Sequence, residues 1–223
     1  MPGHLPGQRT GYTATPRNIF YARGGEIFLP GPCVLVSTAT DGKNTSKTDE
    51  IRAGMVMAQV TSTGKWTPCK RTVTVAGGSG SGSGVGSTAI PVEDASAFIA
   101  GETIYVTQTA GQGLSAGAAT RVIDTVDYAN DIITVTVAAQ YDTGAAVYGA
   151  TAGTEIPRGI LAETVRTLSS EPYNTTVYDK ECVILSAGMV DVNYILGDYA
   201  ACRAATTNYL SGILWSDRQA SVS

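Results

Sequence analysis

Residues that could carry acid–base chemistry are few in this chain of 223 residues. The only histidine is His4, which lies among prolines and glycines near the N-terminus, so Ser-His-Asp and Cys-His arrangements have no base. Two acidic pairs occur, Asp49-Glu50 and Glu93-Asp94, but adjacent side chains point to opposite faces of a strand and diverge in a loop. We interpret both pairs as solvated loop charge and predict that the protein is not an enzyme.

The cysteines show no metal-ligand spacing. No two of the four are close enough in the sequence to form half of a zinc site. Cys33 and Cys182 lie in the apolar runs PCVLV and ECVIL, which indicates buried, reduced thiols. A disulfide between Cys33 and Cys182 is the alternative, and nothing in the spacing favours it. No metal ion or other cofactor is predicted.

A glycine-serine run interrupts the chain. Its segment GGSGSGSG lacks the Lys-Ser/Thr ending of a phosphate-binding loop, and no helix is predicted directly after it. A run of this composition behaves as flexible coil. We therefore predict a tether or hinge with the glycines Gly77, Gly78, Gly80, Gly82 and Gly84.

The residues before this run predict short strands. GEIFLPGPCVLV consists of extended pieces broken by Pro30 and Pro32, and a polar loop follows over residues 40–50. Residues 52–70 predict a hairpin in which STGK turns the chain and Trp66 opens the second strand. RTVTVA continues as a further strand.

The residues after the run predict a second β unit with its own apolar positions. IITVTVAA alternates Ile133, Val135 and Val137 with threonines, which is the period of a strand with one buried face. GETIYVTQ and ATRVIDTVDY are further strands, and Phe98 is expected on a short helical turn before them. Residues 87–150 thus predict a small β domain.

Beyond this unit, IPRGILAETVRT predicts a strand led by Pro157, and ECVILSAGMVDVNYI predicts two strands that turn at Ala187-Gly188. Residues 200–205 favour a helical turn, and Leu210, Ile213 and Leu214 have helical spacing. If the strands on either side of the insert pair with each other, the two ends of the insert meet, and insertion at such a site is tolerated.

The predicted fold class is therefore mainly β. A small core resembling a β-barrel or β-sandwich is interrupted by a small inserted β domain and preceded by an extended N-terminal arm. The predicted divisions are the arm 1–28, the discontinuous core 29–76 and 151–200, the tethered insert 77–150 and the tail 201–223. Within the arm, the apolar tetrad IFYA suits addition as a strand to a partner's sheet, or else packing against the protein's own body.

The charge and hydropathy patterns exclude two kinds of partner. The net charge is -4 and no basic run appears, which argues against nucleic acid, whose phosphates require clustered Lys and Arg. The apolar runs are far shorter than the roughly 18 residues of a membrane span. The N-terminus has no apolar region of a secretory signal, so we expect synthesis in a cytoplasm.

Two passages have a recognisable order. IRAGMVMAQVTSTGKWTPC has Arg-x-Gly followed by a short hairpin, and the chain from IPRGILAETVRT to CVILSAGMVDVNYI has Gly-Ile-Leu-Ala, a polar stretch and apolar segments around a glycine. Together they resemble the head decoration proteins of tailed bacteriophages of the lambda type. The resemblance covers residues 26–76 and 155–197, and neither the Gly/Ser run nor the β insert has a counterpart in the minimal family.

The resemblance implies a structural protein of the virion. Such proteins form homotrimers, bind the major capsid protein at three-fold and quasi-three-fold positions of the outer capsid surface, and stabilise the expanded shell. It also implies an arm that orders on the capsid, with Arg17, Asn18, Ile19, Phe20 and Tyr21 as the capsid-binding residues. The expected location is the virion surface, after synthesis in the host cytoplasm.

Two other functions remain open from the residues. The insert of residues 87–150 could make the protein a virion-surface adhesin that binds a glycan or a host surface. A hydrolase with two carboxylates has the least support, because it would need convergent acids in a cleft.

Overall fold

The protein is described by a computed structural model, which covers residues 25–47, 49–76, 87–110, 118–167, 180–205 and 209–216. Strands dominate these ranges, and the predicted mainly β class is confirmed. Both predicted sets of functional residues lie outside the described residues. These are the capsid-binding residues Arg17, Asn18, Ile19, Phe20 and Tyr21, and the tether glycines Gly77, Gly78, Gly80, Gly82 and Gly84.

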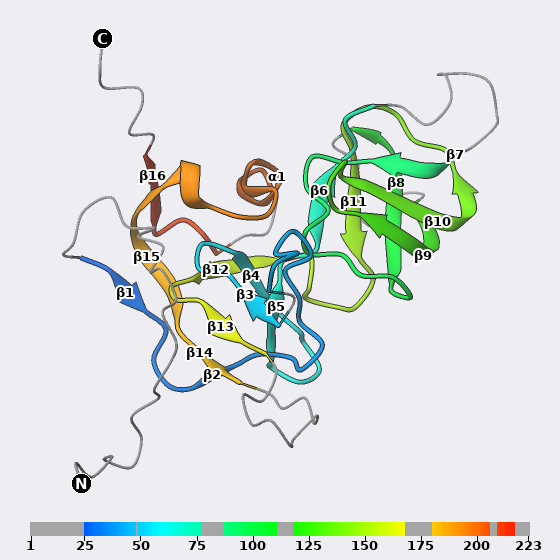
Figure 1. The fold of residues 1–223 in the computed structure, drawn as a ribbon. Helices are drawn as coiled ribbons and strands as arrows, with labels where there is room; N and C mark the ends of the chain where they lie inside the picture. Colours follow the sequence, from blue (N-terminus) through cyan, green and yellow to red (C-terminus); the bar gives the residue numbers. More distant parts are fainter. Residues whose placement is uncertain are drawn as a thin grey trace, which may run out of the picture.

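The described strands form two six-stranded sheets, the body sheet and the barrel, together with two short ribbons (Figure 1). The body sheet has the order β1-β15-β12-β4-β5, and β16 pairs with β15 outside this path. Its strands are β1 (Ile27–Phe28), β4 (Val56–Gln59), β5 (Trp66–Pro68), β12 (Pro157–Leu161), β15 (Ile184–Asp191) and β16 (Ile213–Ser216). The ribbons and helices of the body are β2 (Cys33–Val34) with β14 (Glu181–Cys182), β3 (Glu50–Ile51) with β13 (Val165–Arg166), the 3-10 helix η1 (Val192–Tyr194) and the helix α1 (Tyr199–Arg203).

The body sheet is buried on both faces, because successive residues of a strand point to opposite sides. Val56 of β4 belongs to one apolar cluster and Met57 to the other, and Leu185 and Ile184 of β15 divide in the same way. The helix-side cluster lies under α1 and β16, and consists of Ala53, Val56, Ala58, Cys69, Ile160, Leu185, Val190, Ile195, Cys202, Leu210 and Ile213. The ribbon-side cluster lies against the two ribbons, and consists of Cys33, Leu35, Ala39, Ile51, Met55, Met57, Trp66, Leu161, Val165, Cys182 and Ile184.

The predicted hairpin at the centre of the body is confirmed. β4 and β5 are antiparallel, with Gln59 opposite Trp66. Gly64 turns the chain with a φ of +69°, a left-handed conformation that glycine adopts without steric cost. A strand before the insert also pairs with a strand after it. These are β4 and β12, which are antiparallel with Ile160 opposite Val56.

The predicted turn at Ala187-Gly188 is wrong, because β15 runs unbroken from Ile184 to Asp191. Before this point β15 pairs with β12 and β1, and from Gly188 onward it pairs in parallel with β16. Gly188 has a φ of +144°. The glycine therefore bends a continuous strand at the place where the strand changes partners, which a local pattern cannot distinguish from a turn.

The helical spacing near the C-terminus is also misleading. Ile213 and Leu214 lie on β16, with Ile213 buried and Leu214 60% exposed. Pairing with β15 gives each residue of this segment a strand partner, and this tertiary contact outweighs a weak helical preference. The helical turn predicted over residues 200–205 is present as α1, which Asp198 caps through the amide of Ala201 at 2.8 Å.

The barrel has the strand order β6-β11-β8-β9-β10-β7. Its strands are β6 (Arg71–Val73), β7 (Ser87–Pro91), β8 (Thr103–Ala110), β9 (Ala119–Asp127), β10 (Ile132–Ala139) and β11 (Ala145–Gly149). The two outer strands of this order meet just beyond their ends, where Thr74 bridges Val92 and the Val75 amide donates to the Pro91 carbonyl at 3.1 Å. These contacts curl the sheet back on itself.

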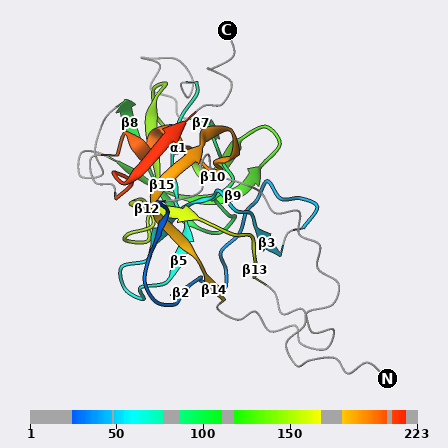
Figure 2. The ribbon, with the colours of Figure 1, turned by 90° about the vertical axis from the view of Figure 1, so that its left-hand side faces the viewer.

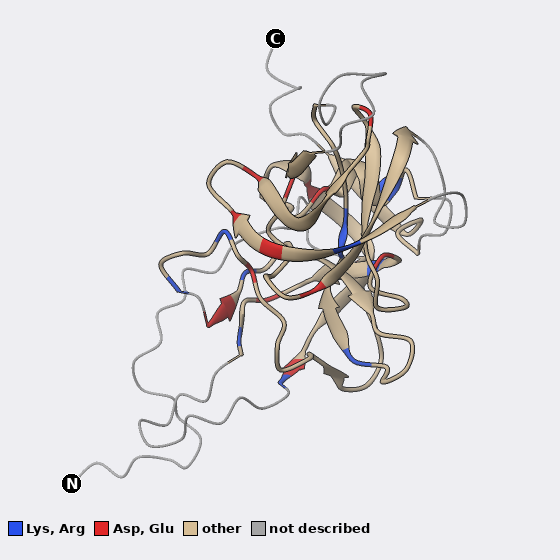
Figure 3. Ribbon diagram, turned by 90° about the vertical axis from the view of Figure 1, so that its right-hand side faces the viewer, with Lys and Arg blue, Asp and Glu red and all other residues tan. Residues whose placement is uncertain are grey.

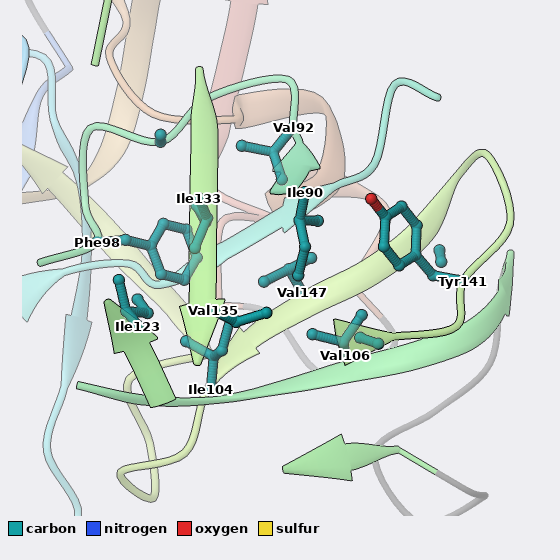
Figure 4. Close-up of a cluster of buried hydrophobic side chains, with 13 residues drawn as sticks. Ile90, Val92, Phe98, Ile104, Val106, Ile123, Ile133, Val135, Tyr141 and Val147 are labelled. Atoms are coloured by element: carbon teal, nitrogen blue, oxygen red, sulfur yellow. The ribbon is translucent and has the colours of Figure 1, made fainter. Parts of the chain in front are cut away.

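The barrel encloses its own apolar core (Figure 4). Ile133 and Val135 are buried as the alternation predicts, but Val137 is 61% exposed. The pairing of β10 with β7 jumps from Thr134 opposite Ala89 to Ala139 opposite Ser87, so the ladder is irregular around Val137. Phe98 is fully buried on a tight turn, in which its amide donates to the Ala95 carbonyl at 3.0 Å, and not on a helix.

The Gly/Ser run has both ends in the barrel. The described strands that flank it are β6 and β7, and the bridge between Thr74 and Val92 holds these strands side by side. β6 precedes the run in the sequence, yet it pairs with β11 of the barrel. The chain therefore passes between body and barrel at residues 69–70 and 150–156, and the run links neighbouring strands of one unit.

Candidate interaction surface

β1 consists of the last two residues of the predicted arm, which the structure describes from residue 25 onward. Its residues Ile27 and Phe28 are 60% and 41% exposed, so two neighbouring large apolar side chains of one strand face solvent. The carbonyl of Ile27 accepts a hydrogen bond from the Ser186 hydroxyl at 2.9 Å, and the Leu29 amide donates to the Ile184 carbonyl at 2.9 Å. β1 is thus fixed to β15 while it presents apolar side chains to solvent.

A groove in the body begins at Leu29, the residue directly after β1. It is lined by Leu29, Pro30, Pro32, Cys33, Gln59, Gly64, Trp66, Arg158 and Tyr209. Arg158 lies over the Tyr209 ring, with the guanidinium carbon 4.6 Å from the ring centre. The buried Nε of Arg158 has no hydrogen-bond acceptor among the described residues. The groove therefore combines prolines and aromatic rings with one cationic side chain, which suits an extended apolar segment with an acidic residue.

β1 and the barrel lie at opposite ends of the molecule (Figure 1). Figure 2 views the molecule from the side of β1, and the barrel lies behind the body. A surface that contacted a partner through β1 would leave the barrel pointing away from that partner. Whether the barrel keeps this direction depends on how firmly the barrel is joined to the body.

The polar loop of residues 40–47 forms one half of the joint between body and barrel. The Lys43 ammonium lies 2.9 Å from Asp131 and 3.6 Å from Asp94, both of the barrel. Partial burial of the amine lowers the pKa of Lys43, but the hydrogen bond to Asp131 and the charges of Asp94 and Asp131 together outweigh it, so the net pKa is raised. Gly42 packs against Tyr128 so closely that any side chain at this position would overlap the tyrosine ring.

The second half of the joint is built on α1. The Asp198 carboxylate accepts hydrogen bonds from the Thr72 hydroxyl at 3.0 Å and the Val73 amide at 3.2 Å. Arg71 donates to the Ala201 carbonyl at 2.9 Å, and its guanidinium lies 4.8 Å from the Tyr148 ring centre. The contacts of the loop 40–47 and the contacts around α1 lie at two separate places, and together they hold the barrel in one orientation on the body.

The acidic pairs do not converge on a cleft, but the expectation of solvated loop charge is wrong for Glu50. Glu50 is only 4% exposed and forms ion pairs with Lys47 at 3.4 Å and Arg166 at 3.8 Å. Asp49 lies 2.8 Å from Arg166, and Asp94 faces Lys43. These carboxylates hold loops in place, since each has a basic partner.

Metal and membrane features were sought within the same described ranges. No group of three His, Cys, Asp or Glu side chains there could hold a metal ion. None of the helices described is long and apolar enough to cross a membrane. Figure 3 shows acidic and basic residues interspersed along the ribbon.

All four cysteines are buried free thiols, as the apolar runs around Cys33 and Cys182 predict. Burial raises the pKa of Cys33, and burial together with Cys33 and Glu163 raises the pKa of Cys182 to about 12. Burial, with a contribution from Cys202, also raises the pKa of Cys69 well above its ordinary value. Such thiols are weak nucleophiles at neutral pH, because the thiolate is the reactive form.

Comparisons with protein-family models, curated proteins and solved structures found no match. The residues of the interaction surface were missed by the sequence analysis, which placed Ile27 and Phe28 at the end of the arm. The sequence does contain an indication of this surface, because IFLP is a short apolar segment that ends at a proline. Whether its side chains are exposed, however, depends on the position of β15, which the sequence does not give.

Proposed function

We propose that this protein is a structural component of a tailed-phage virion. It binds the outer surface of the capsid at three-fold and quasi-three-fold positions, as a homotrimer, and stabilises the expanded shell. The major capsid protein is the partner, and the barrel faces outward. The resemblance in sequence to head decoration proteins motivates this function, and the exposed strand β1 is the observation that carries it.

β1 supports the proposal through its position and its chemistry. Ile27 and Phe28 are the last two residues of the predicted arm and lie at the end of the molecule away from the barrel. Burial of these side chains against a capsid subunit would remove apolar area from water, at about 25 cal/mol per Å². A modest gain at each site is sufficient, because a capsid offers many equivalent sites and symmetry repeats the same contact.

The groove beside β1 supports the same partner class. An extended loop of a capsid subunit could place apolar residues against Trp66 and Tyr209 and an acidic side chain at the Arg158 guanidinium, which lines the groove. The fixed joint between body and barrel would then keep the barrel clear of the shell.

Cosedimentation with expanded capsids of the encoding phage, stripped of decoration, tests the proposal. Ile27→Asp should weaken saturable capsid binding at least about tenfold, because a charge replaces an apolar contact. Val137→Asp is the matched control, since Val137 on the barrel is 61% exposed and Ile27 is 60% exposed. Thermal melts of both variants check that the fold is unchanged.

Equal binding by the Ile27→Asp variant and the wild type would contradict the role of β1. Absence of saturable binding by the wild-type chain would overturn the capsid function itself. Saturable glycan binding by the full chain, in the absence of capsid binding, would favour the adhesin.

A further inference from the structure

The four cysteines lie in two pairs, one on each face of the body sheet. Cys69 and Cys202 belong to the helix-side cluster, and their sulfur atoms are 3.7 Å apart. Cys33 and Cys182 belong to the ribbon-side cluster and are directly opposite each other in the ladder of β2 and β14. Four cysteines scattered through the sequence are therefore sorted into two pairs by the fold.

Both pairs approach the geometry that a disulfide needs. Directly opposed residues of an antiparallel pair have Cα atoms about 4.5–5.5 Å apart. Disulfides form across Cα separations of roughly 4.4–6.8 Å. The sulfurs of Cys69 and Cys202 are already in contact, so side-chain rotation and a small shift of α1 against the end of β5 would bring them to bonding distance.

We propose that Cys33–Cys182 and Cys69–Cys202 are two disulfide sites, which oxidise when the protein is in an oxidising environment. The oxidant is a small disulfide of the glutathione class. One cysteine thiolate attacks a sulfur of the oxidant and displaces one thiolate, and the second cysteine then attacks the mixed disulfide and displaces the other. Each protein pair loses two protons and two electrons, and each oxidant molecule is reduced to two thiols.

The two crosslinks would join the halves of the body that the barrel separates. In each pair one cysteine precedes the barrel in the sequence and the other follows it, and Cys69 and Cys202 are 133 residues apart. A crosslink that closes so long a loop restricts the unfolded chain strongly and stabilises the fold. Disulfides form outside reducing cytoplasm, so a protein released from a cell would gain this stabilisation there.

The two sites should differ in their rates of oxidation. Cys33 lines the groove beside β1, which gives a small oxidant a route to the Cys33–Cys182 pair. Cys69 and Cys202 are only 4% and 1% exposed and do not line this groove. Oxidation of the folded protein should therefore begin at Cys33–Cys182, whereas refolding in the presence of oxidant gives access to both pairs.

Refolding of the full chain in a glutathione redox buffer tests the proposal. After free thiols are alkylated, peptide mapping without reduction should find Cys33 linked to Cys182 and Cys69 linked to Cys202. The oxidised protein should melt roughly 5–10 °C above protein refolded with a phosphine reductant. Addition of oxidised glutathione to the folded protein should link Cys33 to Cys182 first, slowly at neutral pH and faster as the pH is raised, because the thiolate is the attacking form.

Single variants separate the two sites. Cys182→Ala should keep only the Cys69–Cys202 link, and Cys202→Ala should keep only the Cys33–Cys182 link. Four alkylated cysteines after oxidative refolding, a different pairing, or an oxidised form that melts below the reduced form would each overturn the proposal.

Discussion

The carboxylate of Asp198 binds donors from two parts of the fold. One oxygen accepts from the Ala201 amide at 2.8 Å and caps α1, and the other accepts from the Thr72 hydroxyl and the Val73 amide of the barrel. Asp198 is 8% exposed, so loss of its carboxylate would leave these donors without an acceptor in a site that excludes most water. At the scale of single residues, the helix and the joint depend on the same side chain.

We predict that Asp198→Ala lowers the free energy of unfolding by about 2–3 kcal/mol, because a helix cap and two further hydrogen bonds are lost. Urea denaturation followed by circular dichroism measures the change. Asp124→Ala on the exposed face of β9 is the control and should leave the midpoint unchanged. Equal midpoints for the Asp198 variant and the wild type would contradict the role of this carboxylate.

The raised pKa of Cys182 predicts how the stability of the reduced protein depends on pH. The unfolded thiol ionises near pH 8.5, whereas the folded thiol keeps its proton to about pH 12. Between these values the folded state holds more protons, so the free energy of unfolding falls as pH rises and is highest at lower pH. Urea titrations with reductant from pH 7 to alkaline pH should therefore give a steeper loss for the wild type than for Cys182→Ala. Parallel losses would show that this thiol is not protected in the folded protein.

At the scale of elements, β15 organises the body by changing partners along its length. Its first residues pair with β12 and β1, and its last residues pair in parallel with β16. β16 in turn contributes Ile213 to the helix-side cluster while Leu214 points to solvent. A C-terminal strand therefore completes one layer of the core.

The adjacent residues Ile213 and Leu214 distinguish a strand from a helix in solution. Ile213→Ala should cost about 2–4 kcal/mol, because Ile213 is 3% exposed in the core. Leu214→Ala should change the stability by no more than about 0.5 kcal/mol, since its side chain is 60% exposed. On the helix expected from the sequence, both residues would share the buried face, so similar losses in chemical denaturation would argue against β16.

At the scale of the whole molecule, the barrel is fixed to the body by polar contacts of residues 40–47 and of α1. The Gly/Ser run is not one of the connections between the two units, because the strands at its ends are both in the barrel. The outward orientation of the barrel in the proposed virion therefore rests on the joint and on the short connections at residues 69–70 and 150–156.

A double-mutant cycle measures the electrostatic part of the joint. Lys43→Gln and Asp131→Asn should show a coupling of about 0.5–1 kcal/mol in unfolding experiments, since the pair is partly exposed, and high salt should reduce it. Asn suits position 131, whose φ is +54°. Lys43→Gln combined with Asp124→Asn is the control and should be additive. Additivity at Lys43 and Asp131 as well would mean that this ion pair does not hold the barrel.

The sequence alone determined the strand-rich class, the hairpin at Gly64 and the buried positions Ile133 and Val135 of the barrel, although not the exposure of Val137. These features follow from local chemistry, because alternation records which face of a strand is buried and a glycine at positive φ marks a turn. It could not determine that β6 joins the barrel, that β15 continues through Gly188, or that the cysteines form pairs. Those features depend on contacts between residues far apart in the sequence, and only the tertiary structure decides which distant segments meet.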